Sequence, residues 1–378
     1  MAVAFRYANA DEYPKLSGFL DQFWAKDHVY CRKQDLFDWT FRRTGHWDEK
    51  QYSFAMAEDE NGALAGILGG IPFTFNHFGK TSAGMWIVNY VISPDHRKGP
   101  MALQLLSQFR RAEFEPVIAF GINPATSLIY KVLRGEVLPE IPRQFLILPE
   151  ARERMTKLME LVQPEWEPSR RASLTEFFTH PCSEVKGATA SAELPERWDE
   201  IDWPAIAEKT IGASRDKDFL DWRYRRHPVF QYRFIAIPDG LRTGLAVWRL
   251  ETIRRQTEQG RVDVEQIGRL VEFLPASEGN AQQLCSAFID QLRMEGALGA
   301  DYYGFHGQTR ALLQQEGFRP TAEHEDGNSI PTRFQPLDGK GGGILSALFL
   351  KPDVPRCWTD SNCQWLWTKA DSDQDRPN

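Results

Sequence analysis

An internal repeat is the feature that most constrains what this chain can fold into. Residues 36–43 read Leu-Phe-Asp-Trp-Thr-Phe-Arg-Arg, and residues 219–226 read Phe-Leu-Asp-Trp-Arg-Tyr-Arg-Arg. Further matches occur at offsets of 179 to 183 residues, and together they predict two copies of one structural unit. They pair Val91–Pro94 with Glu272–Pro275, the helix face Ala102, Leu105, Leu106 and Phe109 with Ala281, Leu284, Cys285 and Phe288, Gly121–Asn123 with Gly304–His306, and Tyr130 with Leu313.

Each copy has the pattern of an α/β unit. Strand-like segments that alternate with amphipathic helices predict a mixed β-sheet flanked by helices, and hairpins are expected at residues 59–62 and 238–240. We therefore expect an α/β fold with mixed (α+β) sheets, in tandem domains at 1–150 and 201–378. The connecting segment 151–200 begins as a helix over Ala151–Val162. Prolines then break it into short pieces, and its aromatic residues predict that it packs across both domains.

The first copy centres on a strand, a short basic turn and a helix. The β-branched and aromatic residues of 86–92 predict a strand that ends at Ser93-Pro94. Pro100 suits the first turn of the following helix, where its missing N–H group costs nothing. The free N–H groups of that turn, together with Arg97 and Lys98, form a place that favours an anion such as a diphosphate.

The segment after this helix adds a second signal. Residues 117–121 predict another strand, and Asn123 precedes Tyr130 by seven positions. The stretch resembles the acetyl-CoA-dependent N-acetyltransferase superfamily, abbreviated GNAT. In that superfamily a V-x-P-x-x-R-x-x-G-x-G/A turn cradles the CoA pyrophosphate, and an N-x-x-A-x-x-x-Y segment places a tyrosine near the CoA sulfur. Here Pro100 stands where the first glycine of the turn belongs.

The resemblance implies acyl-CoA as co-substrate and no metal. It assigns Tyr130 as the acid that protonates the departing thiolate. The residues that it places at the cofactor are Val91, Ile92, Arg97, Lys98, Gly99, Met101, Ala102 and Asn123.

Two further segments narrow the resemblance. Residues 220–228 read Leu-Asp-Trp-Arg-Tyr-Arg-Arg-His-Pro, and residues 371–377 read Asp-Ser-Asp-Gln-Asp-Arg-Pro. With the doubled unit, they resemble the tandem-domain N-acyltransferases of bacterial surface-polysaccharide clusters, such as those that build O-antigen and lipopolysaccharide. This implies transfer of an acetyl or 3-hydroxybutyryl type of group to the amine of a dTDP-, UDP- or GDP-linked deoxy-amino sugar.

The two copies are not chemically equal. The first has Arg97 and Lys98 at its turn, whereas the matching turn of the second has Glu278 and no base. The second copy also has Leu313 in place of Tyr130, and leucine donates no proton. A pyrophosphate is attracted to the first turn and repelled at the second, so we expect acyl-CoA in the first domain and the acceptor site in the second.

Several polar residues are candidates for the chemistry beside Tyr130. Alternation along the strand predicts that Asn89 faces opposite to Val88 and Tyr90, where it either holds the acceptor amine or closes a sheet edge. His306 matches Asn123 at a strand end, as a base or as a structural histidine. Backbone N–H groups near Val91 are expected to bind the thioester carbonyl, where this strand separates from its neighbour.

Polar residues of the second copy predict the acceptor site. They offer hydrogen-bond donors and one flat ring for a nucleotide diphosphate and its base, although a helix with solvated arginines has the same composition. Asp38 and Asp221 occur in both copies, which favours a structural role at a helix end. The acceptor candidates are Trp222, Arg223, Arg225, Arg226, His227 and Glu272.

Composition excludes several classes of protein. A net charge of −7 argues against nucleic-acid binding. The chain has neither an apolar run long enough for a membrane span nor a secretory leader pattern, so we expect it in the cytoplasm. The cysteines are odd in number and never spaced as C-x-x-C, which favours reduced thiols over disulfides or a zinc site. They are Cys31, Cys182, Cys285, Cys357 and Cys363.

Two other functions remain open from the sequence. One is a tandem transferase that uses aminoacyl-tRNA to build peptidoglycan bridges. Binding of tRNA would require a broader basic groove than this acidic chain suggests. The other is a non-catalytic protein that binds CoA or a sugar nucleotide, which would explain Pro100 in the phosphate turn.

Overall fold

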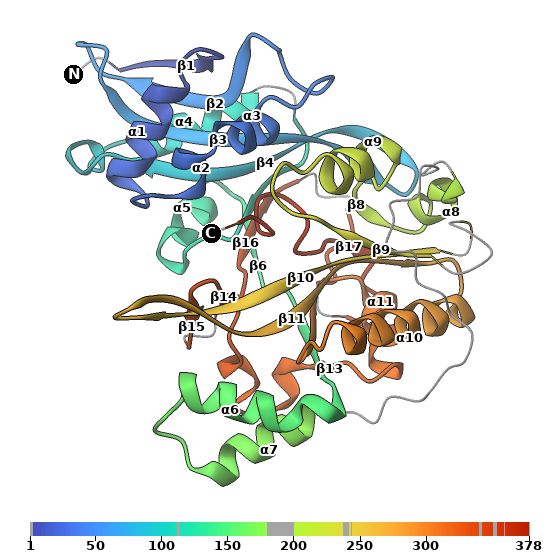
Figure 1. Cartoon of the computed structure of the whole chain (residues 1–378). Coiled ribbons are helices and arrows are strands. Elements are labelled where there is room, and N and C mark those ends of the chain that lie inside the picture. Colours follow the sequence, from blue (N-terminus) through green and yellow to red (C-terminus); the bar gives the residue numbers. More distant parts are fainter. Residues whose placement is uncertain are drawn as a thin grey trace.

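The repeat builds two β-sheets that face each other across the middle of the molecule (Figure 1). The computed structural model describes residues 3–111, 114–179, 200–236, 242, 244–339, 342–350, 354–358 and 360–377. The first sheet runs in the order β1 (Ala4–Asn9), β2 (Gln51–Glu58), β3 (Leu64–His77), β4 (Lys80–Ile92), β5 (Val117–Phe120), β16 (Ser346–Phe349) and β6 (Glu136–Leu138), with β8 (Ile211–Ala213) beside β3 and β17 (Trp365–Leu366) beside β8. The second runs β13 (Arg319–Pro320), β7 (Arg143–Ile147), β12 (Gly299–Tyr303), β11 (Gly260–Pro275), β10 (Gly244–Thr257) and β9 (Arg233–Ile235), and β14 (Arg333–Phe334) pairs with β15 (Leu337–Asp338).

Helices flank both sheets, so the predicted α/β fold with two mixed sheets is confirmed. The helix α4, whose apolar face packs on the first sheet, has α10 as its counterpart on the second. The helices are α1 (Tyr13–Phe23), α2 (Val29–Arg32), α3 (Gln34–Phe41), α4 (Met101–Arg111), α5 (Ser127–Val132), α6 (Arg152–Val162), α7 (Pro168–Phe178), α8 (Trp203–Ala207), α9 (Lys217–Leu220), α10 (Glu278–Met294) and α11 (Gly307–Gln315). A π-helical turn, Asp221–Arg225, continues α9.

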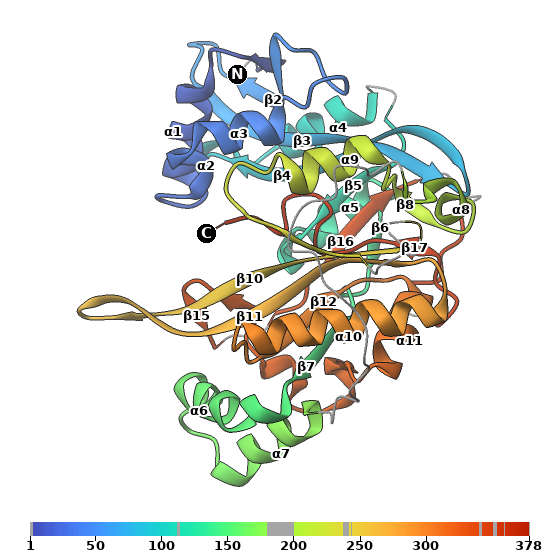
Figure 2. The same ribbon diagram turned by 45° about the vertical axis from the view of Figure 1, so that its right-hand side comes forward.

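The first half contributes β7 to the second sheet, and the second half contributes β8, β16 and β17 to the first. β7 lies between β12 and β13 in the second sheet, and β16 lies between β5 and β6 in the first. In Figure 2 the green strand β7 joins the second sheet, while the red-orange β16 lies with β5 and β6. The sheets therefore do not follow the domain limits expected from the sequence, because each half completes the sheet of the other.

The repeated Asp-Trp segments meet each other. The rings of Trp39 and Trp222 stack with centroids 4.8 Å apart and an interplanar angle of 16°. Trp39 Nε1 donates to the carbonyl of Trp222 at 3.1 Å, and Trp222 Nε1 donates to that of Trp39 at 3.3 Å. Asp38 accepts a hydrogen bond from the Tyr52 hydroxyl at 2.5 Å, which ties α3 to β2.

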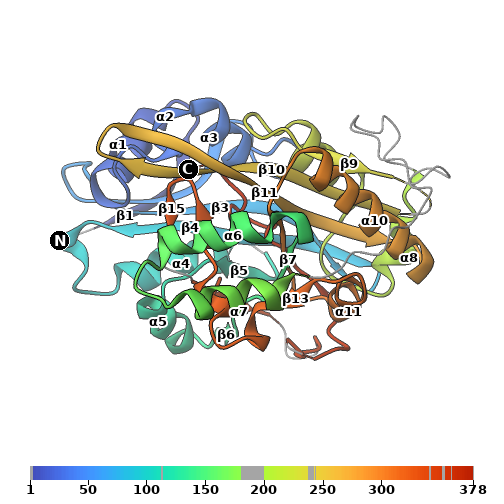
Figure 3. The ribbon, with the colours of Figure 1, turned by 60° about the horizontal axis from the view of Figure 1, so that its bottom comes forward.

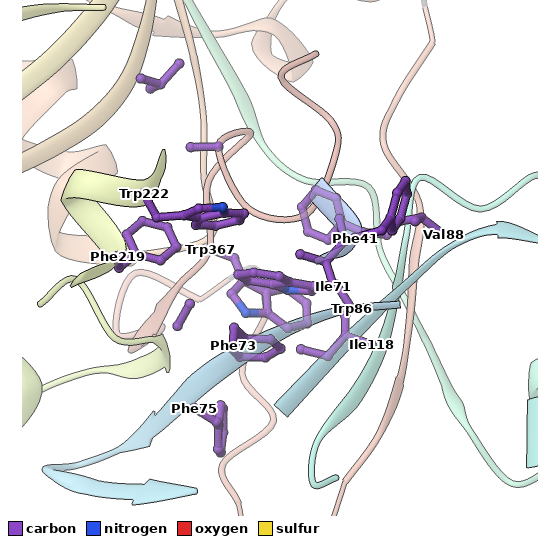
Figure 4. Packing of buried hydrophobic residues seen from close by; sticks show 14 of the residues in the cluster. Phe41, Ile71, Phe73, Phe75, Trp86, Val88, Ile118, Phe219, Trp222 and Trp367 are labelled. Carbon is purple, nitrogen blue, oxygen red and sulfur yellow. The ribbon is translucent and has the colours of Figure 1, made fainter. Parts of the chain in front are cut away.

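Aromatic packing joins the halves through one core. Phe73 stacks on Trp86 with centroids 3.9 Å apart, on the face of the first sheet that also contacts Trp222 and Trp367 (Figure 4). Trp367 comes from the C-terminal segment. This core therefore belongs to neither copy alone.

The segment after residue 150 was predicted to pack across both domains, but its helices α6 and α7 pack on the second sheet. α6 and α7 lie side by side (Figure 3), and their buried residues, such as Met159 and Phe178, belong to the core of the second sheet. Pro168 begins α7 and does not interrupt a helix, since proline is compatible with the first helical position. Residues 180–199, including Cys182, lie outside the described residues.

Hairpins agree with the sequence where they are described. β2 and β3 are joined by a turn in which Asp59 Oδ1 accepts hydrogen bonds from the N–H groups of Asn61 and Ala63, and Gly62 has a φ of +76°. β10 and β11 extend as a long two-stranded arm that ends at Thr257 and Gly260 (Figure 2). The hairpin expected at 238–240 lies outside the described residues.

We predict that residues 1–150 will not fold when produced alone. Without β16, strands β5 and β6 lose the neighbour that pairs with both of them, which exposes unpaired backbone groups and the apolar surface beneath. Co-production with residues 151–378 should restore a cooperative urea transition monitored by circular dichroism. A cooperative transition of the isolated fragment would contradict the importance of the exchange.

Candidate active site

β4 contains a bulge at its centre. Val88 pairs with Gly69 and Val91 pairs with Ile67, so Asn89 and Tyr90 lie opposite Leu68 alone. Asn89 adopts a φ of +51°, in the left-handed region that is uncommon for residues other than glycine.

This bulge corrects one expectation. Val88 lies in the core shared with Trp86, whereas Tyr90 packs against the core that contains Leu105, on the other face of the sheet. Strict alternation would have placed Val88 and Tyr90 on one face, but the extra residue reverses the direction of the side chains that come after it.

β4 and β5 part just before this bulge. They pair in parallel only from Met85 with Val117 to Ile87 with Ala119, and β4 continues to Ile92 without β5 beside it. The strand around Val91 therefore separates from its neighbour, as the sequence predicted, and binding of a ligand to its backbone groups stays a prediction. The side-chain amide of Asn89 is buried, and neither its nitrogen nor its oxygen has a hydrogen-bond partner among the described residues.

The basic turn after β4 is exposed. A 3₁₀ turn over Pro94–His96 leads to Arg97, Lys98 and Gly99, all at the surface. Gly99 has a φ of +134° and open space where a side chain would be. Pro100 precedes α4, and its carbonyl accepts from the N–H group of Gln104 at 3.0 Å.

The other predicted cofactor residues flank this turn. Arg97 Nε donates to the carbonyl of Ile92 at 3.2 Å, which draws its side chain back toward β4. The side chains of Val91 and Met101 are buried in the core, and Ala102 is half-buried on the first turn of α4. Contact between a cofactor and Val91 or Met101 would therefore use mainly their backbone atoms.

Tyr130 and Asn123 lie beyond the end of β5. Tyr130 is buried on α5 with its ring centroid 6.1 Å from that of Phe349, which belongs to the exchanged strand β16. Burial raises the pKa of Tyr130, so its hydroxyl remains protonated at neutral pH. Asn123 Oδ1 accepts from the N–H group of Ala125 at 2.9 Å.

A cavity of about 750 Å³ lies between the two halves, and we call it the central cavity. It begins at Gly121–Asn123, directly after β5, and continues to the second sheet and the C-terminal segment. Five basic and two acidic side chains line it, so it carries a positive excess inside a chain of net charge −7. Its charged residues are Arg249, Glu251, Arg269, Arg333, Asp338, Lys369 and Arg376.

The wall of this cavity is a network of ion pairs. Arg269 binds Glu251 at 2.6 Å and Asp301 at 2.7 Å, and Arg249 binds Asp375 at 2.6 Å. These residues were not predicted from the sequence. Their signal was present, because Arg249, Glu251 and Arg269 place charges on one face of otherwise apolar strands.

The predicted acceptor residues lie elsewhere, and none of the six lines either described cavity. Arg223 is buried and donates to the carbonyls of Ala370 at 2.6 Å and Asp375 at 2.9 Å. His227 Nδ1 accepts from the backbone N–H group of Phe230 at 2.9 Å, and burial lowers the pKa of His227 to about 3.

The remaining members of that set are also accounted for. Trp222 is held against Trp39 at the contact between the halves. Arg225 and Arg226 are exposed near Asp221 and Asp218. The cluster read as an acceptor site is thus largely a structural contact with the C-terminal segment, and only its two exposed arginines match the solvated alternative.

Glu272 is fully buried and binds Arg215 at 2.7 Å. Arg215 also binds Asp371 at 2.9 Å, and the Tyr224 hydroxyl donates to Glu272 at 2.7 Å. Burial, together with the second carboxylate, outweighs Arg215 and raises the pKa of Glu272 to about 7. Substrate therefore has no access to this carboxylate.

The second sheet has a matching bulge, but the place where its parallel strands stop pairing is not left open. β11 and β12 pair as far as Leu270 with Tyr302, and Val271 bulges opposite β10. Beyond β12 the C-terminal segment occupies the free edge, because Gly304 forms a β-bridge with Thr368.

His306 caps α11 through Nδ1, which lies 2.8 Å from the Thr309 hydroxyl, and burial lowers the pKa of His306 to about 4. It lines a separate cavity of about 220 Å³, whereas Asn123 lines the central cavity. The structure therefore does not bring His306 together with Asn89 and Tyr130, and its contacts fit the structural role.

Solved structures share this fold. Saccharomyces cerevisiae N-myristoyltransferase with bound myristoyl-CoA superposes with a TM-score of 0.56 and 13% identity, over 97% of this chain and 89% of that one. A GCN5-related N-acetyltransferase from Anabaena variabilis superposes with a TM-score of 0.54 and 11% identity, over 91% and 72%. The chain has the tandem GNAT fold. No family model and no curated protein sequence matches it.

Within the described part of the chain, no helix combines the length and apolar character needed to cross a bilayer. In the same residues, no three or more His, Cys, Asp and Glu side chains group as metal ligands.

We predict that Glu272→Gln will change how stability depends on pH. The pKa of Glu272 is raised above its ordinary 4.5, so its contribution to stability is present below pH 4.5 and is lost as the pH rises through about 7. Gln stays neutral, and the variant should gain on the order of 1–3 kcal/mol relative to wild type between pH 5 and pH 8. Urea unfolding at both pH values measures this difference, with Glu278→Gln, on the surface, as the matched control. A wild type that gains on the variant as pH rises would contradict the shift.

Proposed function

We propose that this chain is an acyl-CoA-dependent N-acyltransferase that binds acyl-CoA in its first half. The observation that carries the proposal is the parting of β4 from β5 beside the bulge at Asn89, with the exposed basic turn directly after β4 and the central cavity starting directly after β5. The same fold in the yeast enzyme holds myristoyl-CoA, which supports acyl-CoA as the co-substrate.

The first half suits the cofactor better than the second. Arg97, Lys98 and the first N–H groups of α4 offer a positive site for the pyrophosphate, with Gly99 allowing close approach. At the matching turn, Glu278 opposes an anion, and the Ser277 side chain already accepts from the N–H group of Asn280. The pantetheine arm would then run along the free edge of β4, with the thioester near Asn89.

The acceptor is proposed to be the amine of a nucleotide-linked deoxy-amino sugar, bound in the central cavity. The positive excess of that cavity suits a diphosphate, and its proposed contacts are Arg333, which is exposed, and Arg376, which also pairs with Asp373 at 2.6 Å. Trp24 presents a partly exposed ring at the same cavity, with Arg376 5.7 Å from its centroid, as a surface for a nucleobase. These residues replace the cluster around Trp222 as acceptor contacts.

The proposed reaction depends mainly on holding the amine and the thioester in the right orientation. The neutral amine attacks the thioester carbonyl, and backbone N–H groups at the bulge stabilise the oxyanion. The Tyr130 hydroxyl then protonates the thiolate of CoA as the C–S bond breaks. Asn89, with its unpaired amide at the bulge, is proposed to hold the acceptor amine. The four described cysteines are free thiols, which suits a reaction in the reducing cytoplasm.

Mass spectrometry of reaction mixtures tests the proposal directly. Purified protein is incubated with acetyl-CoA or 3-hydroxybutyryl-CoA and with dTDP-, UDP- and GDP-linked amino sugars, and the products are searched for the acyl mass. Acylated sugar nucleotide is expected, with little product from the free amino sugar. Transfer only from aminoacyl-tRNA, or binding of acyl-CoA without any product, would favour the other two functions.

We predict that replacing both Arg97 and Lys98 by Ala will raise KM for acyl-CoA at least about tenfold and leave kcat nearly unchanged. Each charge-assisted bond contributes about 1.5–3 kcal/mol to ground state and transition state alike. Glu278→Ala, at the matching turn, is the control and should leave KM as it is. Steady-state kinetics with varied acyl-CoA would refute this cofactor site if KM for the double variant stayed at the wild-type value.

We predict that Tyr130→Phe will lower kcat by about tenfold to a hundredfold. A general acid contributes about 10²–10⁴-fold, but a thiol with a pKa near 8.5 leaves well without help, so the low end is expected. KM for acyl-CoA should not change, because the ring still packs against Phe349.

The control for Tyr130 is Leu313→Ala, at the matching place in the second half. Leu313 is fully buried, so this variant should lose about 2–5 kcal/mol of stability and keep the specific activity of its folded fraction. Calorimetry measures that fraction. Full kcat in Tyr130→Phe would place the chemistry elsewhere.

A further inference from the structure

Lys369 is a basic side chain that has no anionic partner among the residues that the structure describes. It lines the central cavity, and its ammonium nitrogen lies 4.9 Å from the ring centroid of Tyr303. Among the described residues, no side chain or carbonyl forms an ion pair or hydrogen bond with this nitrogen.

The carboxylates around Lys369 are already neutralised by arginines. Glu251 on β10 binds Arg269 at 2.6 Å and Arg249 at 3.1 Å. Asp301 on β12 binds Arg269 at 2.7 Å and also Arg143 of the exchanged strand β7 at 2.9 Å.

The C-terminal segment contributes the third carboxylate, Asp375, which binds Arg249 at 2.6 Å and accepts from the Tyr232 hydroxyl at 2.7 Å. Every carboxylate that faces Lys369 from β10, β12 and the C-terminal segment is therefore held by at least one guanidinium.

A positive charge on Lys369 is unfavourable, because arginines already neutralise the carboxylates around it. Desolvation and the nearby guanidinium of Arg269 both disfavour the ammonium form and lower the pKa of Lys369 to about 7. The pKa of Glu251 is held at about 2 by Arg269 and Arg249, so the carboxylate does not take up the proton instead. Lys369 is thus the basic group of this cavity that titrates near neutrality.

We propose that Lys369 is a catalytic residue, the base that takes a proton from the ammonium group of the acceptor in the central cavity. This role rests on the proposed N-acyltransferase function. The acceptor enters as R–NH₃⁺, and transfer of one proton to the neutral amine of Lys369 leaves R–NH₂ with a free electron pair. That pair forms the C–N bond, and the C–S bond breaks with its electrons on sulfur. Tyr130 gives its proton to the thiolate, and the second amine proton, released to solvent, replaces the proton that Tyr130 has lost.

The surroundings of Lys369 suit both of its states. Before transfer, the absence of a carboxylate partner favours the neutral amine. After transfer, the face of the Tyr303 ring stabilises the ammonium by a cation–π contact without binding it to an anion. The proton then returns to solvent through the cavity, and the base is regenerated.

Competitive labelling measures the base without requiring turnover. Trace acetic anhydride reacts with neutral amines only, and mass spectrometry follows the Lys369 peptide between pH 5 and pH 11. Half-maximal labelling is expected near pH 7. A short lysine peptide added to the same solution is the control, because a lysine in water has a pKa of about 10.4 and is labelled at much higher pH. Titration of Lys369 together with the control peptide would overturn the proposal.

Kinetics tests the role itself. Lys369→Met should lower kcat about a hundredfold at pH 7, leave KM for acyl-CoA unchanged, and recover part of its rate with added ethylamine. Lys369→Arg keeps the charge but not the base and should not recover activity, and Lys157→Met, exposed on α6, is the control. Full kcat in Lys369→Met, or no rescue of it, overturns this role alone. A wild type that acylates no sugar nucleotide overturns the proposed function and the role together.

Discussion

The exchange of β7 and β16 is the constraint on which the rest of this structure depends. β16 is hydrogen-bonded on both sides, to β5 and to β6, so it is an inner strand of a sheet formed mostly by the other half. The carbonyl of Leu345, just before it, accepts from the N–H groups of Gly121 and Ile122. The segment that leads into β16 therefore fixes where β5 ends. That end lines the central cavity, and the cavity can exist only while the halves are locked together.

Electrostatics inside this cavity depends on the same arrangement. β7 brings Arg143 beside Asp301, so the exchanged strand contributes to the ion pairs of the second sheet. Buried charges are costly unless they are paired, and here each buried carboxylate is matched to a guanidinium with planar geometry. The pairs fix the wall of the cavity, and basic side chains outnumber acidic ones along its lining by five to two. A chain with net charge −7 thereby has a local excess of positive charge.

The repeat was sufficient to predict two mixed sheets, the strand around Val91 and the helix after it, because each depends on local periodicity. The bulge at Asn89 was not predictable, since residues 85–92 are apolar on both faces and a change of face leaves no trace in such a run. The predicted role of Arg223 in acceptor binding was wrong for a different reason. Its partners are carbonyls about 150 residues further along the chain, and nothing near position 223 signals that they are there. The cavity cations likewise come from segments that are far apart in sequence.

The repeat extends to the point at which each sheet opens. Both sheets have a bulge at which parallel strands stop pairing. In the second half, the free end of β12 is covered by the C-terminal segment, and Arg215 ties Glu272 to Asp371 of that segment. The opening in the second sheet is therefore filled. At the end of β5 the same segment contributes Trp367, whose ring centroid lies 5.9 Å from that of Phe120, and Gln374, whose amide donates to the carbonyl of Phe120 at 3.2 Å. One segment thus closes one half and borders the other, so the structural asymmetry of the copies depends on residues outside the repeat.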